Sequence, residues 1–294
     1  QQGKQRELTQ AGVELLGSPS AASDAEVIAL AAAVLQAAGL TEFTLCLGHS
    51  GFLENLLSAY QVDTTERALI KHLFNKKDFV ALKNQVSQLP LAAWQKENIL
   101  RVPSLRGGRE VLTAARELLP EPQAALPLTT LAEVWSVLEE YGVTKYLQLD
   151  LGLVRLLDYY TGMVFEGYTG GLGYALCGGG RYDQLLDNFG PSQPAVGFAV
   201  SIDHLITVLT KQKKLPALSL PVDVAYGAGG RAAAVAVVQA LRAAHTTAAL
   251  AVAEVSAAEA RRQSTARGAQ RLLYYSDAGV LDLDLQKEAG ESRC

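Results

Sequence analysis

Sulfur-containing residues are scarce in this chain of 294 residues, which has three cysteines and one methionine. Cys46, Cys177 and Cys294 are far apart in the sequence, and no two of them form a C-x-x-C motif. This spacing argues against a disulfide framework or a zinc knuckle and favours a reducing cytoplasm. Since the only methionine is Met163, the chain has no initiator, and we expect that Gln1 is not the native start.

Long apolar runs and an excess of positive charge are also absent. No apolar run reaches the length of about 18 residues that a membrane span requires. The first twenty residues carry Lys4, Arg6, Glu7 and Glu14, unlike a signal peptide. The chain has 26 Lys+Arg against 30 Asp+Glu, a net charge of −4, which disfavours nucleic-acid binding because Lys and Arg on phosphates supply most of that affinity. We therefore expect a cytoplasmic protein that binds neither membrane nor nucleic acid.

Motifs for metal binding and nucleophilic catalysis are missing as well. His49, His72, His204 and His245 do not form H-E-x-x-H or another metal spacing. No G-x-S-x-G elbow and no recognisable cysteine nucleophile is present. Gly227–Gly230 stands where a dinucleotide fingerprint would stand, but it lacks the last glycine, so a tight turn is favoured over a nucleotide site.

The first two thirds of the chain predict a sheet interrupted by helices. Strands are expected at residues 6–14 and 41–48, and Ser23 and Glu26 are expected to cap the helix between them. Residues from about 56 to 140 have helical periodicity. Residues 146–203 return to strands with Gly- and Pro-rich turns at hairpin distances, which indicates an antiparallel sheet. The strands expected there are Tyr146–Asp150, Met163–Tyr168, Tyr174–Cys177 and Ala195–Ser201.

The helical stretch carries interleaved basic side chains, namely Lys71, Lys76, Lys77 and Lys83. Such a pattern favours a solvated helix face over an anion site.

The last part of the chain alternates strand and helix after a linker around Lys211–Pro221. This alternation is typical of a small α/β domain with a parallel sheet. The expected elements are strands at Val222–Tyr226, Ala248–Val252 and Arg271–Tyr275, with helices near 231–243 and 257–267. We expect an α+β protein with a core at 1–212, a helical insertion at about 56–142, and a small α/β domain at 220–294.

The segment Leu153–Gly162 contains several charged and polar aromatic residues between apolar strands. It contains Arg155, Asp158, Tyr159 and Tyr160. A buried arginine needs a partner because an unpaired desolvated charge is costly. Two interpretations are equally supported by this segment alone: a structural Arg–Asp pair, or a carboxylate-binding site that uses the bidentate guanidinium.

Several segments resemble a known superfamily. Leu153–Gly162 (LVRLLDYYTG) resembles the first histidine-specific signature of histidyl-tRNA synthetases and their relatives. Gly178–Asp183 together with Ala195–Ala199 resembles the second, glycine-rich signature running into class II motif 3. Gly3–Glu14 resembles the back half of class II motif 2. The resemblance implies a class II synthetase-like antiparallel sheet flanked by helices.

Two branches of this superfamily are candidates. The synthetase motif 3 carries an arginine that clamps ATP phosphate, and the matching stretch here is Ser201–His204. Imidazole is shorter and has no bidentate fork, so nucleotide activation should suffer. Leu47–His49 and Lys76–Asp78 also resemble the regulatory branch. The resemblance therefore implies the regulatory subunit of short-form ATP phosphoribosyltransferase, in histidine biosynthesis, which activates the catalytic subunit and mediates feedback inhibition by histidine.

The resemblance implies further partners and two alternatives. The expected partners are the short-form catalytic subunit, further copies of the chain and histidine as effector. No catalytic residue, cofactor or metal is expected in the chain. The alternatives are a divergent histidyl-tRNA synthetase and a stand-alone histidine sensor that acts on another partner.

Carried over residue by residue, the resemblance also implies a histidine pocket. Glu14 and Tyr160 would address the imidazole nitrogens, Gln10 the amino acid's polar backbone, and Arg155 its carboxylate, while Tyr182 and Gly197 would line the wall. These polar groups suit a zwitterion with a titratable ring, because each buried polar group then finds a partner. The alternative is a vestigial pocket whose residues only support the sheet.

The start of the chain falls inside the segment that resembles motif 2. In the family, a long N-terminal stretch with motif 1 precedes this position. We therefore expect roughly a hundred further residues upstream of Gln1 and an incomplete first domain.

Overall fold

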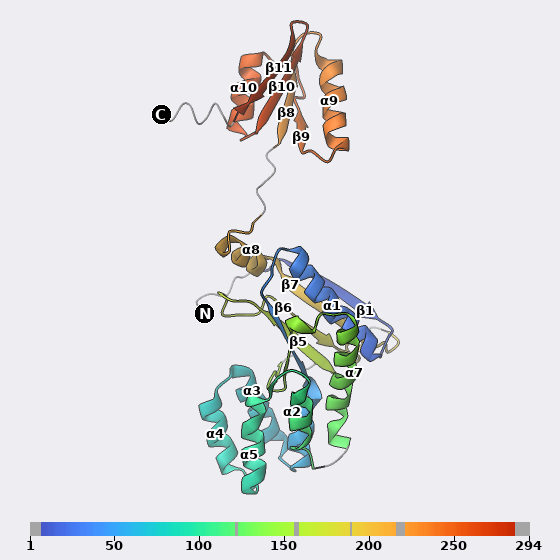
Figure 1. The fold of residues 1–294 in the computed structure, drawn as a ribbon, viewed down its shortest axis with the longest axis vertical. Coiled ribbons are helices and arrows are strands. Elements are labelled where there is room, and N and C mark those ends of the chain that lie inside the picture. The colour runs from blue at the N-terminus through green and yellow to red at the C-terminus, as the bar shows by residue number, and fades with distance from the viewer. Residues whose placement is uncertain (1–6, 121–122, 156–158, 189, 216–220, 286–294) are drawn as a thin grey trace. The chain divides into compact units, whose positions relative to one another are not determined.

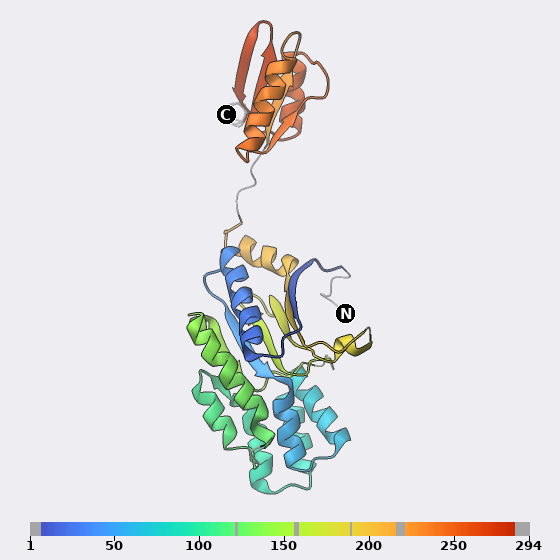
Figure 2. The same ribbon diagram turned by 90° about the vertical axis from the view of Figure 1, so that its right-hand side faces the viewer.

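The computed structural model describes residues 7–120, 123–155, 159–188, 190–215 and 221–285 (Figures 1 and 2). The chain divides into two compact units, Gln1–Leu215 and Pro216–Cys294. None of the helices in these ranges has the length and apolar character needed to cross a membrane.

A seven-stranded sheet forms the centre of the first unit, with the strand order β1-β7-β6-β5-β2-β4-β3. All neighbouring strands are antiparallel except β2 and β4. This confirms the expected antiparallel sheet of the class II synthetase type. The strands are β1 (Gln10–Leu16), β2 (Thr44–His49), β3 (Arg106–Gly107), β4 (Leu147–Asp150), β5 (Met163–Tyr168), β6 (Cys177–Arg181) and β7 (Ala195–Ser201).

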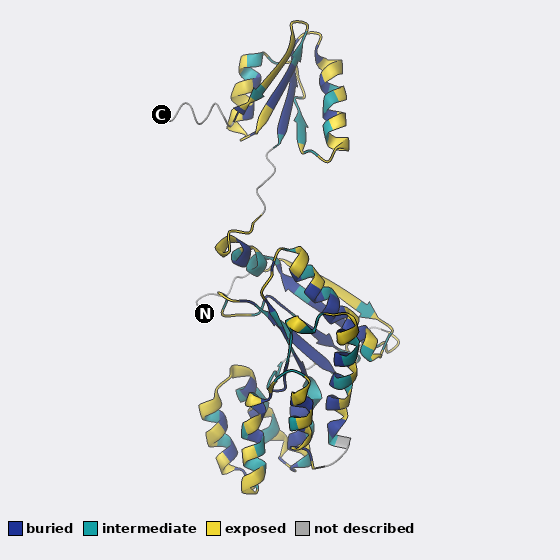
Figure 3. Cartoon of the chain, viewed as in Figure 1, coloured by how far each residue is buried: buried dark blue, intermediate teal, exposed yellow. Residues whose placement is uncertain are grey.

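Helices α1 (Ala21–Ala37) and α7 (Leu126–Glu140) pack against each other and cover one face of this sheet (Figure 2). The strand residues facing them include Leu45, Leu47 and Phe165, which are fully or almost fully buried. Figure 3 shows the resulting pattern, with buried strands in the middle of the unit and exposed helix surfaces outside.

The chain between β2 and β4 is largely helical, as the sequence predicts. Its helices are α2 (Ser50–Ala59), α3 (Thr64–Lys76), α4 (Phe79–Gln88), α5 (Ala93–Arg101), α6 (Glu110–Arg116) and α7. Ile70, Phe74 and Ile99 are buried and belong to the same hydrophobic core as the sheet. The two-residue strand β3 lies in this stretch and is not predicted by the sequence. Helix α8 (Ile202–Lys211) follows β7 and ends the unit.

The register of the sheet separates a buried face from a polar one. Residues opposite each other in antiparallel strands point to the same face, and so do residues two apart along one strand. The pairs Glu14–Gly197, Ala199–Gly178 and Glu166–Cys46 therefore place polar groups and glycines on the face opposite α1 and α7. This surface is called the polar face below.

The second unit has a four-stranded sheet in the order β11-β10-β8-β9. Its strands β8 (Val222–Tyr226), β9 (Ala248–Leu250) and β10 (Arg271–Ser276) are parallel, as the sequence predicts, and α9 (Arg231–Ala243) and α10 (Ala257–Ala266) match the expected helices closely. The sequence prediction misses β11 (Gly279–Asp284), an antiparallel edge strand reached by a short turn from β10.

Two predictions of local structure are wrong. The strand expected at Tyr174–Cys177 is instead β6, which contains the three consecutive glycines that strand propensity disfavours. The helix expected to be capped by Ser23 begins at Ala21, and Ser20 is its N-cap residue, with its hydroxyl accepting from the Ser23 amide.

Arg181 explains why the helix begins earlier. Arg181 lies on β6, and its guanidinium is buried. It donates to the Asp24 carboxylate (2.9 Å) and to the Ser23 hydroxyl (2.9 Å) on α1. It also donates to the Ser18 carbonyl oxygen (3.0 Å) and to Asp183 (2.9 Å). Ser23 is thus a partner of the buried cation, and Ser20 is left to cap the helix.

Replacement of Asp24 tests this buried ion pair. We expect Asp24→Asn to lower the free energy of unfolding by about 3 kcal/mol, because the buried Arg181 guanidinium is then left with Asp183 as its one carboxylate partner among the described residues. The measurement is urea unfolding. The control is Glu97→Gln on the exposed side of α5, for which a change within about 0.5 kcal/mol is expected. Equal stabilities of the two variants would contradict the assignment.

His49 gives the unit a predictable pH dependence. Its Nδ1 accepts from the Gly51 amide at 3.1 Å and caps α2, and burial lowers its pKa from 6.5 to about 4. The unfolded chain therefore takes up the proton more readily than the folded chain, so stability falls as pH decreases from 6.5 to 4. We expect a loss of at most about 3.4 kcal/mol from this group. Urea unfolding of His49→Asn, which retains a capping oxygen, should show a flatter profile across this window, and an unchanged profile would refute the role of His49.

Candidate functional site

A pocket of about 320 Å³ lies on the polar face over β1, β7 and β6. Its volume is at the lower end of the range for small-molecule sites, about 300–1,000 Å³. All six residues that the sequence assigns to a ligand pocket line this one: Gln10, Glu14, Arg155, Tyr160, Tyr182 and Gly197. The structure thus brings together residues that lie up to 187 positions apart in the chain.

Glu14 lies directly over the backbone of β7. It is paired in register with Gly197, and a Cβ on Gly197 would be 1.6 Å from Glu14 Oε2 and 2.5 Å from the Val13 carbonyl oxygen. Only a residue without a side chain leaves room for the carboxylate at this position. The hydroxyl of Tyr182 donates to the same carboxylate and fixes its orientation.

Three tyrosines form an aromatic wall. The rings of Tyr159 and Tyr160 have centroids 4.6 Å apart, and those of Tyr159 and Tyr182 are 6.0 Å apart in an edge-to-face arrangement. Burial raises the pKa of both Tyr160 and Tyr182, and hydrogen bonding to Tyr159 and to Glu14, respectively, raises it further. Both hydroxyls therefore keep their protons at neutral pH and can act as hydrogen-bond donors.

Arg155 supplies the positive charge of the pocket. Its Nη1 lies 3.4 Å from the Phe165 carbonyl oxygen and 3.6 Å from Glu166 Oε1, and its guanidinium is 5.4 Å from the centroid of the Tyr160 ring. A Cβ on Gly178 would be 2.3 Å from Nη1, so the arginine rests on bare backbone. Its carboxylate neighbour is Glu166. Asp158, the other partner considered from the sequence, lies outside the described residues.

The arrangement has separate places for charges of opposite sign. Glu14 can accept hydrogen bonds at one end of the pocket, Arg155 can donate to a carboxylate, and the tyrosines between them offer apolar rings with donor hydroxyls. This combination fits a small zwitterion that carries a polar ring.

Sequence reasoning misses two neighbours of the site. Tyr159 lines the pocket, and its place beside Tyr160 in the same signature could have indicated it. Glu166 could not be found from a motif, because only the pairing of β5 with β2 and β6 places it next to Arg155.

His204 does not line this pocket. It lies in the first turn of α8, where its Nδ1 is 3.0 Å from the Ala175 carbonyl oxygen and its ring lies 4.1 Å from that of Tyr174. A carbonyl oxygen only accepts, so Nδ1 carries a proton and is engaged by the backbone. Within the described ranges, no group of three or more His, Cys, Asp or Glu side chains could hold a metal ion.

Comparison with known proteins identifies relatives of this chain. The family model described as histidyl-tRNA synthetase matches residues 1–205. A curated relative from Desulforamulus reducens, named ATP phosphoribosyltransferase regulatory subunit, is 37% identical over 280 residues, covering 95% of this chain and 70% of the relative. A protein of the same name from Halothermothrix orenii is 41% identical over 213 residues, covering 72% of this chain and 50% of the relative.

Solved structures show the same fold. An ATP phosphoribosyltransferase regulatory subunit/histidyl-tRNA synthetase from Bacillus halodurans aligns with a TM-score of 0.79 and 34% identity, covering 94% of this chain and 70% of that one. Histidyl-tRNA synthetase from Nostoc aligns with a TM-score of 0.76 at 19% identity, covering 98% and 74%, which supports the fold alone.

The sheet, its polar face and the matched signatures define a class II synthetase-like protein of the histidyl-tRNA synthetase type. Within this class, the chain belongs to the family of ATP phosphoribosyltransferase regulatory subunits. Its named relatives are regulatory subunits, as the sequence predicts. The chain spans 70% of the first of these relatives and half of the second.

Gly197→Ala tests the packing of the pocket floor. We expect a loss of about 1–3 kcal/mol in the free energy of unfolding, because the added methyl group would contact both the Val13 carbonyl oxygen and the Glu14 carboxylate. Gly170→Ala is the matched control, since an added Cβ there meets nothing within 4 Å. Urea unfolding of both variants is the measurement, and a Gly197→Ala protein as stable as the control would show that β1 does not pack as described.

Proposed function

We propose that the chain is a non-catalytic regulatory subunit that binds the short-form ATP phosphoribosyltransferase catalytic subunit, raises its activity and transmits feedback inhibition by histidine. The observation that carries the proposal is the convergence of Gln10, Glu14, Arg155, Tyr160, Tyr182 and Gly197 on one pocket. The names of the relatives support the partner.

Histidine matches the polar groups of this pocket one by one. Its carboxylate pairs with Arg155, which already lies beside a carboxylate at 3.6 Å. Its ring is addressed by Glu14 and Tyr160, and Gln10 meets the polar backbone of the amino acid. Tyr182 holds Glu14 in place through its hydroxyl. Each polar group of the ligand then has a partner, as binding in a partly buried site requires.

Feedback control requires that histidine bind two states of the assembly with different affinity. A coupling free energy of about 1–3 kcal/mol is typical of such systems. The pocket can provide it because Arg155 has an internal partner, Glu166, with which a ligand carboxylate must compete.

The proposal includes a cytoplasmic location, contact with further copies of the chain, and no role for nucleic acid. The two described cysteines are unpaired thiols, and the net charge is −4. Both features suit a protein of metabolic regulation better than one that holds tRNA.

The rival function, histidine activation by a divergent histidyl-tRNA synthetase, is favoured by the description of the matching family model. It predicts histidine-dependent exchange of pyrophosphate into ATP. We expect no exchange, because His204 is engaged by Ala175 and offers no bidentate clamp for phosphate. Robust exchange would overturn the regulatory proposal.

A titration of the purified chain with histidine tests the pocket directly. We expect one saturable site by calorimetry, and at least about tenfold weaker binding to Arg155→Ala, because a lost charged hydrogen bond costs about 1.5–3 kcal/mol. The control is Arg109→Ala, whose guanidinium pairs with Glu139 on the exposed surface at 3.0 Å.

The same variants separate binding from regulation when the short-form catalytic subunit is present. The concentration of histidine that halves phosphoribosyltransferase activity should rise by the same factor in Arg155→Ala and stay unchanged in Arg109→Ala. Histidine binding that is insensitive to Arg155 would contradict the site, and an unchanged reaction rate in the presence of the chain would contradict the regulatory role.

A further inference from the structure

A second pocket lies on the polar face, on the other side of Arg155. It has a volume of about 490 Å³ and is enclosed between β5, β2 and β4 of the sheet and the α3–α4 corner of the helical segment. The Arg155–Glu166 ion pair separates the two pockets, since Arg155 lines the first and Glu166 lines the second.

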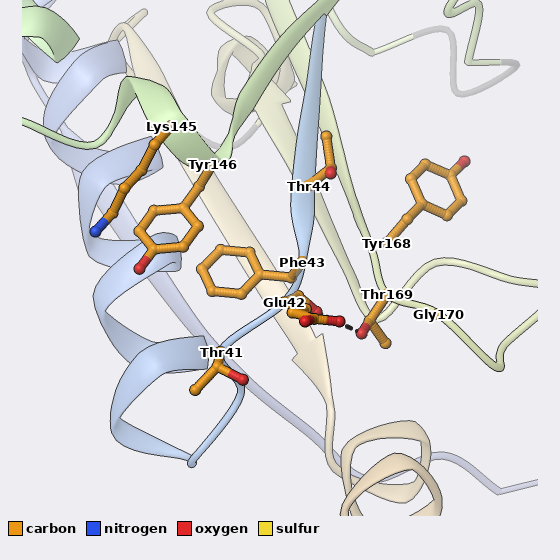
Figure 4. Close-up of a pocket in the computed structure, with 9 residues that line it drawn as sticks. All are labelled: Thr41, Glu42, Phe43, Thr44, Lys145, Tyr146, Tyr168, Thr169 and Gly170. Atoms are coloured by element: carbon orange, nitrogen blue, oxygen red, sulfur yellow. Dashed lines mark hydrogen bonds between the residues drawn. The ribbon is translucent and has the colours of Figure 1, made fainter. Parts of the chain in front are cut away.

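The floor of this second pocket is polar because of the sheet register. Cys46 is paired with both Glu166 on β5 and Gln148 on β4, and Thr44 is paired with Tyr168. These side chains therefore point to one face. Figure 4 shows Thr44 and Tyr168 on one side of the sheet. The α3–α4 corner provides the opposite wall with Phe74, Asn75, Lys77 and Phe79.

The carboxylates of this pocket are already engaged. Asp150 pairs with Arg106 at 3.1 Å and accepts from the Gly152 amide at 3.0 Å. Glu166 pairs with Arg155 and accepts from the Tyr168 hydroxyl. Burial raises the pKa of Asp150, and the charges of Arg106 and Lys77 oppose that shift, so Lys77 acts on this carboxylate without forming an ion pair with it.

The pocket also contains donors with remaining capacity. Among the described residues, no carboxylate lies within ion-pair distance of Lys77, whose Nζ lies 5.6 Å from the centroid of the Tyr168 ring. The Gln148 amide oxygen accepts from the Cys46 thiol at 4.0 Å. Among the described residues, the Gln148 amide nitrogen and the Thr44 hydroxyl have no hydrogen-bond partner. An ammonium group with two neutral donors is a setting for an oxyanion.

Lys77 also differs from the other lysines of the helical segment. Lys71 pairs with Glu54 at 2.9 Å, whereas Lys76 and Lys83, which are exposed like Lys77, do not line the pocket. The backbone of Lys77 is left-handed (φ 54°) where α3 ends, and the Asp78 side chain caps α4 immediately after it. The turn between the two helices thus holds Lys77 at the pocket mouth.

From this cavity and its unused donors, we propose that the second pocket is a binding site for a small oxyanion, a carboxylate or a phosphate, held by Lys77, Thr44 and Gln148. The Lys77 ammonium group neutralises the ligand, and the hydroxyl and amide donate hydrogen bonds to its oxygens. This site does not depend on the identity of the ligand in the first pocket.

A third hollow, at the ends of β2 and β5, shows the contrast (Figure 4). Its cation, Lys145, is accompanied by the Glu42 carboxylate, so the hollow offers no excess of positive charge. The Thr169 hydroxyl in this hollow donates to the Glu42 carbonyl oxygen at 2.6 Å, and the stacked rings of Phe43 and Tyr146 close one side.

Cys46 makes the proposal testable at the site itself. Its thiol lines the second pocket, whereas Cys177 is buried on the opposite face. Burial raises the pKa of Cys46 to about 11, so its alkylation is slow enough to time. The experiment measures the rate at which N-ethylmaleimide labels Cys46, by peptide mass spectrometry, with inorganic phosphate or succinate added at constant ionic strength set with chloride.

We expect saturable protection that reaches about tenfold when the anion exceeds its Kd tenfold. Protection by phosphate alone or by succinate alone supports the site and identifies the oxyanion it prefers. Labelling rates that do not respond to either anion would overturn the proposal.

A matched pair of variants assigns the protection to Lys77. Lys77→Asn removes the charge and retains a residue that tolerates left-handed backbone, and Lys83→Asn makes the same change on the exposed surface of α4. Protection should be lost in the first variant and retained in the second, with thermal unfolding confirming that both are folded. Equal protection in Lys77→Asn and the unchanged chain would refute the proposed role of this pocket.

Discussion

The first unit depends on the buried guanidinium of Arg181, which joins β6 to the start of α1 and to the segment leading into β7. It pairs with Asp24 on α1 and with Asp183, and the same Asp183 carboxylate accepts from the Ala195 amide at the start of β7. Since this side chain points to the buried face, alternation along β6 turns Gly178 and Gly180 to the polar face. The interaction that anchors β6 thus also leaves its other face without side chains.

That bare backbone is what allows a ligand pocket on a sheet. Arg155 rests on Gly178, and the Tyr160 ring would be only 2.9 Å from a Cβ on Gly180. The side chains of Arg155 and Tyr160 therefore contact the backbone of β6 directly, without intervening side chains. On the neighbouring strands, where Cys46, Glu166 and Gln148 replace the glycines, the polar face is covered by side chains and forms the floor of the second pocket. One surface carries two pockets because its side chains change from glycine to polar along the strand order.

Much of this could be predicted from the sequence, and the rest could not for identifiable reasons. Periodicity gave β5 and β7 at their observed bounds and most of the second unit, because these segments are apolar strands between clear turns. The six residues of the first pocket were found through their motifs. The bounds of β6 and the cap at Ser20 depend on Arg181, and the contact of Arg155 with Glu166 depends on strand pairing. A local sequence pattern does not reveal tertiary partners of this kind. Strand β3 is only two residues long, so it has no periodicity that could be detected.

The position of His204 suggests a physical reason why a synthetase-like pocket would be used for regulation. In an enzyme, binding energy is most useful when it is realised in the transition state, which for amino-acid activation requires groups that hold ATP phosphate. Here the corresponding imidazole is tied to the Ala175 carbonyl oxygen and lies outside the pocket, while Arg155, Glu14 and the tyrosines remain arranged around it. Under the proposed function, the binding free energy of histidine acts instead on the conformational equilibrium of the protein. Under the proposed function, a histidine carboxylate takes the place of Glu166 at Arg155, and Glu166 belongs to the wall of the second pocket, so the proposal links the occupancy of one pocket to the electrostatics of the other.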